Sequence, residues 1–147
     1  MKIDDLFIKI VKELRAGRKS YKKIADKLKV TENTVRSRVN KLTHEKIFDI
    51  CGLVDPSKIP GHRIVIIGIK LLEMNLVEKG KEISKLKGMV SVSVVTGRYD
   101  LIAIVIFKSG FGLLEFYTDE ISKVKGIQSV ETFVVYKSYN MMVPYVL

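Results

Sequence analysis

Apolar positions recur at helical spacing in the first thirty residues. Asp4 is a good N-cap for the first helical pattern, which ends at Gly17. Ser20 is a good N-cap for the second. The sequence therefore predicts two short helices, each with one buried face. The expected buried positions are Leu6, Ile10, Val11 and Leu14, then Ile24, Ala25 and Leu28.

A third helix is predicted after a short turn at residues 29–30. Thr31 is its N-cap, and Glu32 places an acid in the first turn, where it suits the helix dipole. A narrow apolar seam runs along it, formed by Val35, Val39 and Leu42. The opposite face carries Asn33, Ser37, Asn40 and His44, flanked by Arg36 and Lys41. Three helices with a short turn before the third are typical of a helix-turn-helix. Residues 47–54 alternate loosely and predict a strand that closes a small winged unit.

The pattern changes beyond Pro60 and Gly61, which end a predicted linker. Strands are predicted at 63–72, 90–96, 101–107 and 130–137, with helices at 76–86 and 111–124. Residues 87–92 and 125–130 match at four of six positions, and each copy follows a helix and opens a strand. The unit is therefore strand–helix–strand repeated twice, a ferredoxin-like βαββαβ arrangement, and the fold class of the whole chain is α+β.

Two of the predicted strands, 63–72 and 101–107, are apolar on both faces. In this arrangement the helices cover only one face of the sheet, so the other face needs a cover. A second copy of the chain is the economical cover, and we expect a symmetric homodimer. The apolar tail at 141–147 is expected to pack on a neighbouring subunit.

The charge is clustered near the second and third helices. The chain carries a net charge of +10, and residues 15–41 hold ten basic and two acidic side chains. Such a field on a small helical module favours double-stranded DNA as a partner, because binding releases counterions. A helical bundle with a merely solvated basic face is the alternative. The residues expected at the DNA are Ser20, Lys22, Lys23, Thr31, Asn33, Thr34, Arg36, Ser37, Arg38, Asn40 and Lys41.

Other classes find little support in the composition. The longest uncharged apolar run, 101–107, is too short to cross a bilayer, and the first residues do not form a signal peptide. The single cysteine, Cys51, fits a reducing cytoplasm. His44 and His62 lie far apart in the sequence, so we expect no metal site and no cofactor. No pairing of a nucleophile with a base is recognisable, so we do not expect an enzyme.

Three segments in order resemble the Lrp/AsnC (feast/famine) family of regulators: residues 34–42, 54–59 and 96–101. The resemblance implies a DNA-binding helix-turn-helix domain at 1–50, a hinge at 51–62 and a ferredoxin-like domain for effector binding and oligomerisation at 63–147. It also implies dimers that can assemble into tetramers or octamers. Amino acids or related metabolites are then expected between subunits, at Thr96, Gly97, Arg98, Tyr99 and Asp100.

The chain departs from the family pattern at three places. Lys46 stands where a helix-stopping glycine is usual, which leaves the end of the third helix open. Phe7 and Ile8 replace polar residues and suggest an added apolar contact. Arg98 replaces a residue that is often acidic, and a cation there favours an effector with an acidic or amide side chain.

Alternatives remain for the effector loop and for the function. Residues 97–100 could be no more than a β-hairpin turn, in which Asp100 holds backbone N–H groups instead of a ligand ammonium. A sirohaem-decarboxylase-like enzyme has a similar two-part architecture and would use His44 or His62. A regulatory subunit that binds no DNA is the third alternative.

Overall fold

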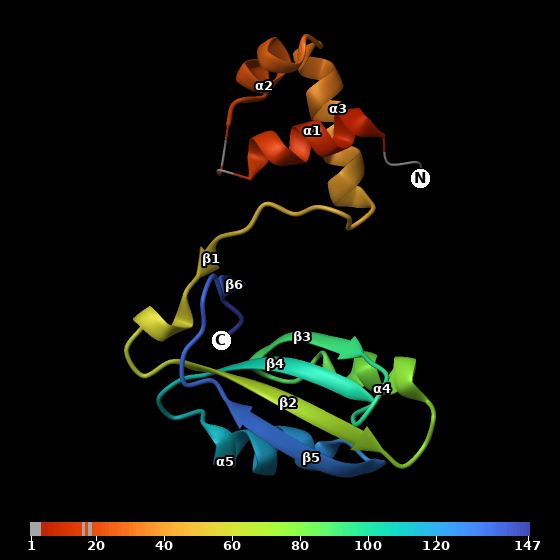
Figure 1. The fold of residues 1–147 in the computed structure, drawn as a ribbon, viewed down its shortest axis with the longest axis vertical. Helices are drawn as coiled ribbons and strands as arrows, with labels where there is room; N and C mark the ends of the chain where they lie inside the picture. The colour runs from red at the N-terminus through yellow and green to blue at the C-terminus, as the bar shows by residue number, and fades with distance from the viewer. Residues whose placement is uncertain (1–3, 16, 18) are drawn as a thin grey trace. The chain divides into compact units, whose positions relative to one another are not determined.

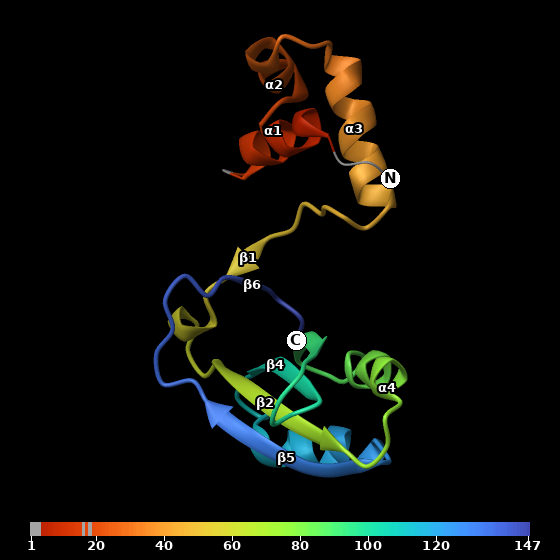
Figure 2. The same ribbon diagram turned by 45° about the vertical axis from the view of Figure 1, so that its right-hand side comes forward.

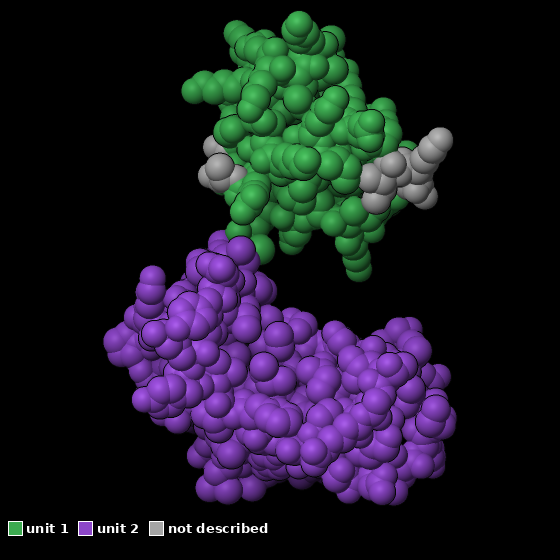
Figure 3. Space-filling view, viewed as in Figure 1, with its two compact units in different colours: residues 1–51 green, residues 52–147 purple. Residues whose placement is uncertain are grey.

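The computed structural model describes residues 4–15, 17 and 19–147 (Figure 1). The chain divides into two compact units, residues 1–51 and 52–147 (Figure 3). Each unit has its own buried apolar cluster.

The first unit consists of three helices, α1 (Asp5–Leu14), α2 (Tyr21–Leu28) and α3 (Glu32–His44). Each begins at the predicted N-cap, whose side-chain oxygen accepts a backbone N–H of the first turn. Their apolar stripes meet in one core, and the three-helix prediction is confirmed. The core residues are Ile10, Leu14, Ile24, Ala25, Val35 and Val39.

α3 ends with Lys46 in the left-handed region, at φ +55°. The Lys46 N–H donates to the Thr43 carbonyl at 3.0 Å, and the Ile47 N–H donates to the Leu42 carbonyl at 2.9 Å. These two bonds form the Schellman motif that usually has glycine at the left-handed position. The helix therefore stops where a glycine would stop it, although the lysine Cβ makes this conformation costly.

The predicted strand at 47–54 is wrong for all but its last two residues. β1 covers only Leu53–Val54, and it pairs with β6 (Val143–Pro144) inside the second unit (Figure 2). The described residues of the first unit thus contain no strand, and the predicted wing is wrong. The strand propensity of 47–52 finds no neighbouring strand with which to pair, and strand structure depends on such a neighbour.

The second unit contains a four-stranded antiparallel sheet in the order β3-β4-β2-β5. The predicted βαββαβ arrangement is confirmed, although β5 begins and ends three residues earlier than predicted. The main elements are β2 (Arg63–Leu71), α4 (Leu76–Ile83), β3 (Met89–Val94), β4 (Leu101–Phe107) and β5 (Ile127–Val134). Between β4 and β5 the chain is helical from α5 (Leu113–Glu115) through a π-helical turn (Phe116–Glu120) to a 3-10 turn (Ile121–Lys123).

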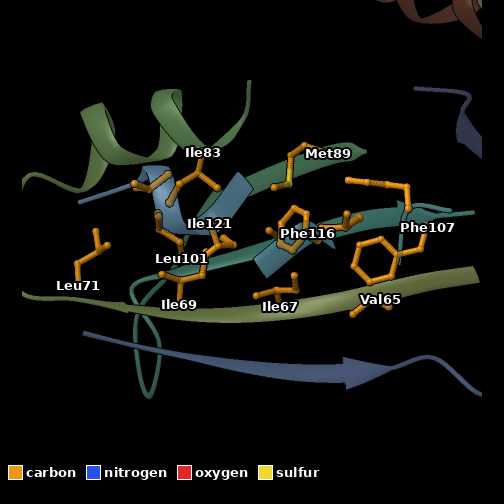
Figure 4. Close-up of a cluster of buried hydrophobic side chains, with 14 residues drawn as sticks. Val65, Ile67, Ile69, Leu71, Ile83, Met89, Leu101, Phe107, Phe116 and Ile121 are labelled. Atoms are coloured by element: carbon orange, nitrogen blue, oxygen red, sulfur yellow. The ribbon is translucent and has the colours of Figure 1, made fainter. Parts of the chain in front are cut away.

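The main core lies between the sheet and its helices (Figure 4). Alternate residues of β2 and β4 point into it, including Ile67, Ile69 and Val105, each 0% exposed. Phe116 from the π-helical turn packs on Phe107, with ring centroids 5.5 Å apart. Burial of these aromatic and branched side chains supplies the stability of this unit.

The opposite face of the sheet is covered only in part. Val143 in the tail is buried against Ile64 and Ile106. The expectation that the tail packs on a neighbouring subunit is therefore wrong for Val143, which packs on its own sheet. The Tyr99 ring covers Gly68 on the same face. Ile104 remains half-buried and Phe133 is 42% exposed, so part of this face is open in the single chain.

Candidate functional site

The outer face of α3 presents short polar side chains. Asn33, Ser37 and Asn40 are all exposed, while the seam on the other side of the helix is buried. The Thr31 hydroxyl caps the helix by accepting the Thr34 N–H at 3.1 Å. A capped helix with one buried side and one side of amides and hydroxyls can present hydrogen-bonding groups to base edges.

Two arginines of α3 make contacts within the unit. Arg38 lies 3.0 Å from the Asp4 carboxylate, and its guanidinium carbon lies 4.5 Å from the centre of the Phe7 ring. Arg38 therefore links α3 to α1. The sequence had predicted only a contact between Arg38 and DNA. Arg36 pairs with Glu32 at 2.8 Å and stacks near the ring of Tyr21. Phe7 is buried as the added apolar contact requires, whereas Ile8 is 47% exposed.

The lysines of the first unit fall into two groups. Lys19 and Lys27 both bind Glu13, at 2.9 and 2.5 Å, and the hydrogen bond from Lys27 is the main cause that lowers the pKa of Glu13. Among the described residues, the exposed Lys22, Lys23 and Lys41 have no carboxylate partner within 4.0 Å. Charge is thus available to an external anion on the first turn of α2 and on α3, and also on α1, where Lys9 and Lys12 are exposed without an ion pair among the described residues. Ser20 caps α2, accepting the Lys23 N–H at 3.3 Å.

Residues 96–99 form the turn of the β3–β4 hairpin, closed by the Val95 N–H and the Asp100 carbonyl at 3.0 Å. Gly97 has φ +113°, and Thr96 and Arg98 are exposed. One oxygen of the Asp100 side chain accepts the Leu71 N–H at 2.8 Å, and the other lies 2.9 Å from the Lys70 ammonium. The hydrogen bond from Leu71, followed by that from Lys70, lowers the pKa of Asp100. Asp100 is thus engaged in holding the hairpin, as the turn interpretation predicted.

Tyr99 folds back from this hairpin over β2. A Cβ placed on Gly68 would lie 2.7 Å from the Tyr99 ring, so the ring needs a glycine beneath it. The Tyr99 hydroxyl donates to Glu131 of β5, and this bond is the first cause that raises the pKa of Tyr99. Arg98 binds the same Glu131 carboxylate at 3.0 Å. Neither Gly68 nor Glu131 is predicted from the sequence as a partner of Tyr99, although a glycine inside a β-branched run was an available signal for Gly68.

Five hollows on the described residues are lined by other segments, and the loop at 96–100 lines none of these five. An effector held there would need walls from another molecule.

The two histidines lie in different units. His62 contacts the Tyr145 hydroxyl at 3.1 Å, and His44 lies exposed on α3. No cluster of three or more potential metal ligands exists among the described residues. No described helix has the length and apolar character needed to span a membrane.

Comparison with known proteins matches both units. The model of the AsnC-type helix-turn-helix domain matches residues 3–43, and that of the Lrp/AsnC ligand binding domain matches residues 64–144. An HTH-type transcriptional regulator of Pyrococcus furiosus is 35% identical over 138 residues, 91% of each chain. The HTH-type transcriptional regulator Ptr1 of Methanocaldococcus jannaschii is 26% identical over 142 residues, 94% of this chain and 95% of that protein.

Solved structures share the fold. Escherichia coli AsnC has a TM-score of 0.74 at 24% identity, over 96% of this chain and 97% of that one. A transcriptional regulator of Neisseria meningitidis, solved as a complex with L-Met, has a TM-score of 0.73 at 18% identity, over 99% of this chain and 96% of that one. With matched domains in both units, the chain belongs to the Lrp/AsnC family and is a helix-turn-helix DNA-binding transcription regulator.

Proposed function

We propose that α3 of this chain reads DNA in the major groove and that the lysines of α2 hold the flanking phosphates. The exposed row of Asn33, Ser37 and Asn40 on a helix capped by Thr31 carries this proposal. Asparagine side chains can bind adenine with two hydrogen bonds, and serine can bind either partner of a base pair. Lys22, Lys23 and Lys41 supply the charges that displace counterions.

Arg38 contributes to this interface in a different way from the one expected. Its ion pair with Asp4 and its stacking on Phe7 make it a support that orients α3 on α1. Arg36 can exchange Glu32 for a phosphate, because both side chains are exposed. The proposed DNA residues are therefore Ser20, Lys22, Lys23, Thr31, Asn33, Thr34, Arg36, Ser37, Asn40 and Lys41, with Arg38 as the positioning residue.

The open part of the sheet face supports a homodimer. Ile104 is half-buried and Phe133 is 42% exposed on the face that no helix covers. Apolar side chains in a continuous sheet face are stabilised when a second copy removes them from water. A two-fold dimer carries two DNA-binding units, which implies a pseudo-palindromic site with half-sites about 34 Å, or a multiple of that, apart.

An amino-acid-type effector is proposed at the hairpin turn, on Thr96, Gly97, Arg98 and Tyr99. Thr96 and Arg98 are exposed there, and Gly97 has no side chain that could block the approach of a ligand to its backbone. The Neisseria regulator of the same fold binds L-Met, which supports this class of ligand. Asp100 then acts by holding the turn through Leu71 and Lys70, and Glu131 neutralises Arg98 until a ligand carboxylate takes its place. The ligand can alter DNA binding only if it prefers one assembly over another.

Selection of bound fragments from genomic DNA, with and without the twenty amino acids, tests this function. A shared pseudo-palindromic motif, and a change in its occupancy with one amino acid, are expected. Calorimetry with that amino acid should show weaker binding for Arg98→Gln than for wild type, with Lys85→Gln as the control. Fragments without any shared motif would contradict sequence-specific binding. The regulator is proposed to act in the cytoplasm. A Soret band in the purified protein would contradict the proposed function and favour a tetrapyrrole enzyme.

A further inference from the structure

A hollow of about 390 Å³ lies in the second unit, at the opposite end of the sheet from the β3–β4 hairpin turn. It forms where three segments meet: the 3-10 turn Pro56–Lys58, the start of β2 and the chain just after β5. Its polar wall consists of Ser57, His62, Arg63, Tyr136, Lys137 and Ser138. Its floor includes the apolar side chains of Ile64 and Val135.

The charges that line this hollow are unbalanced. Arg63 and Lys137 are permanent cations, and no Asp or Glu is among the lining residues. Neither cation forms an ion pair with any described residue, whereas Lys70 and Arg98 of the same unit each bind a carboxylate. The Lys137 ammonium lies 5.2 Å from the centre of the Tyr139 ring, and the Asp55 carboxylate just outside the lining accepts the Ser57 hydroxyl at 2.6 Å. A second hollow on the other side of Arg63 contains Lys108 and again no acid.

Part of the lining is held in place by hydrogen bonds, whereas the side chains of Tyr136 and Lys137 are exposed. The Val135 N–H donates to the Ile64 carbonyl at 3.2 Å, which joins the chain after β5 to β2. His62 is held by the Pro60 carbonyl at 3.0 Å and by the Tyr145 hydroxyl at 3.1 Å. The Ser57 hydroxyl donates to Asp55 at 2.6 Å. The donors left for a ligand are therefore Arg63, Lys137 and the hydroxyls of Tyr136 and Ser138.

We infer that this hollow binds the oxyanion group of a small metabolite, a carboxylate or a phosphate. A guanidinium can hold such a group with two parallel hydrogen bonds, and an ammonium adds a point charge. The volume lies in the range of small-molecule sites, and the apolar floor suits a short carbon skeleton. The concave shape and this floor favour a small molecule over the backbone of a DNA duplex.

This site is separate from the hairpin turn. Arg63 pairs with Phe107 at one end of the β2–β4 ladder, whereas Ile69 pairs with Leu101, the residue after Asp100, at the other end. A bound anion would connect Arg63 at the start of β2 to Lys137 in the chain after β5. The inference does not depend on the proposed DNA contacts.

Titration of the full-length protein with sodium phosphate and, separately, sodium acetate tests the inference by amide NMR at constant ionic strength. Sodium chloride serves as the baseline. Saturable shifts are expected at residues 62–64 and 134–138 for one or both anions, with a millimolar midpoint. Arg63→Gln combined with Lys137→Gln should weaken this binding at least about tenfold, since both charge-assisted contacts are lost. Lys81→Gln combined with Lys125→Gln removes the same charge elsewhere and should bind like wild type.

Several results would overturn the inference: shifts that never saturate, shifts that also follow chloride, or equal binding by the Arg63 and Lys137 double variant. The relative affinities for phosphate and acetate identify the oxyanion. If a DNA duplex displaced phosphate from these residues and the same double variant weakened DNA binding equally, the hollow would be a DNA contact and not a metabolite site. A protein that binds DNA normally but neither anion would contradict this site alone.

Discussion

The aromatic ring of Tyr99 lies directly over Gly68, so close that a Cβ on Gly68 would be 2.7 Å from the ring. This contact lets the hairpin turn after β3 reach across β2 to Glu131 on β5. Gly68→Ala is therefore expected to displace the ring and destabilise the protein by about 1–3 kcal/mol, the usual cost of overpacking. Chemical denaturation of the full chain measures the change.

The matched control is Gly80→Ala in α4. Its Cβ would meet only side-chain atoms at 3.8 Å or more, so the exchange should be neutral or stabilising by up to about 1 kcal/mol. In a Tyr99→Ala background, Gly68→Ala should lose most of its effect. Additive effects of the two substitutions would show that the ring and the glycine do not interact.

Lys46 occupies the left-handed position that ends α3, at φ +55°. Lys46→Gly is expected to raise the free energy of unfolding of the first unit by about 1 kcal/mol, because glycine adopts this conformation without a steric cost. Thermal unfolding followed by circular dichroism can measure it. Lys46→Ala keeps the Cβ and should have little effect; equal stabilisation by both variants would assign the gain to the lost charge.

The two exposed lysines in the first turn of α2 are expected to bind phosphates. Lys22→Ala combined with Lys23→Ala should weaken binding to every DNA sequence and reduce the salt slope of log K by about one to two. Fluorescence anisotropy at several salt concentrations measures the slope. Lys9→Ala combined with Lys12→Ala removes the same charge from α1 and should change the slope less. An equal change in both double variants would leave only a general charge effect.

Asn40 on the outer face of α3 is expected to contact a base edge. Asn40→Ala should reduce the difference in binding free energy between specific and random DNA by about 1–3 kcal/mol, with little change in the salt slope of log K. The same anisotropy experiment, with both DNAs, provides the comparison. Uniform weakening on both would instead make Asn40 a phosphate contact.

Ile104 lies on the helix-free face of the sheet, where the dimer interface is proposed. Val105 points into the core and is 0% exposed, whereas Ile104 is half-buried on the open face. Ile104→Asp should therefore yield a folded monomer, because it places a charge in the proposed interface. Light scattering at micromolar concentration measures the mass. Met74→Asp, at a side chain that is 84% exposed, should remain a dimer. A wild-type monomer would exclude this interface.

Asp100 has a pKa below the usual value, mainly because its carboxylate accepts the Leu71 N–H. A lowered folded-state pKa stabilises the protein above the unfolded value near 3.8, and this contribution is lost as the pH falls through the folded-state pKa. Asp100→Asn should remove this contribution to stability. The difference in free energy of unfolding between wild type and variant should therefore shrink as the pH falls from about 5 to about 2. Thermal melts across this range measure the difference. A constant difference would assign the role of Asp100 to something other than its charge.

Local periodicity determined the three helices of the first unit and the main strands of the second, but not the segment at 47–52, which forms no strand. The helix caps at Asp4, Ser20 and Thr31 and the apolar strand at Leu101–Phe107 were predicted from neighbours within a few residues, and the structure confirms them. Helices depend on contacts between i and i+4, and such contacts are readable in the sequence. The order of these elements and the internal repeat at 87–92 and 125–130 predicted the ferredoxin-like arrangement, and the count of charged residues predicted the basic character of the first unit.

The tertiary structure decided which side chains are engaged and which are available. Arg38 reaches Asp4 on another helix, and Asp100 is held by Lys70, thirty residues away. Tyr99 meets Glu131 only because the strand order brings β5 beside β2. Even the strand at Leu53–Val54 required Val143–Pro144 as a partner. Contacts between residues far apart in the chain depend on register and packing, and a pattern of neighbours does not contain them.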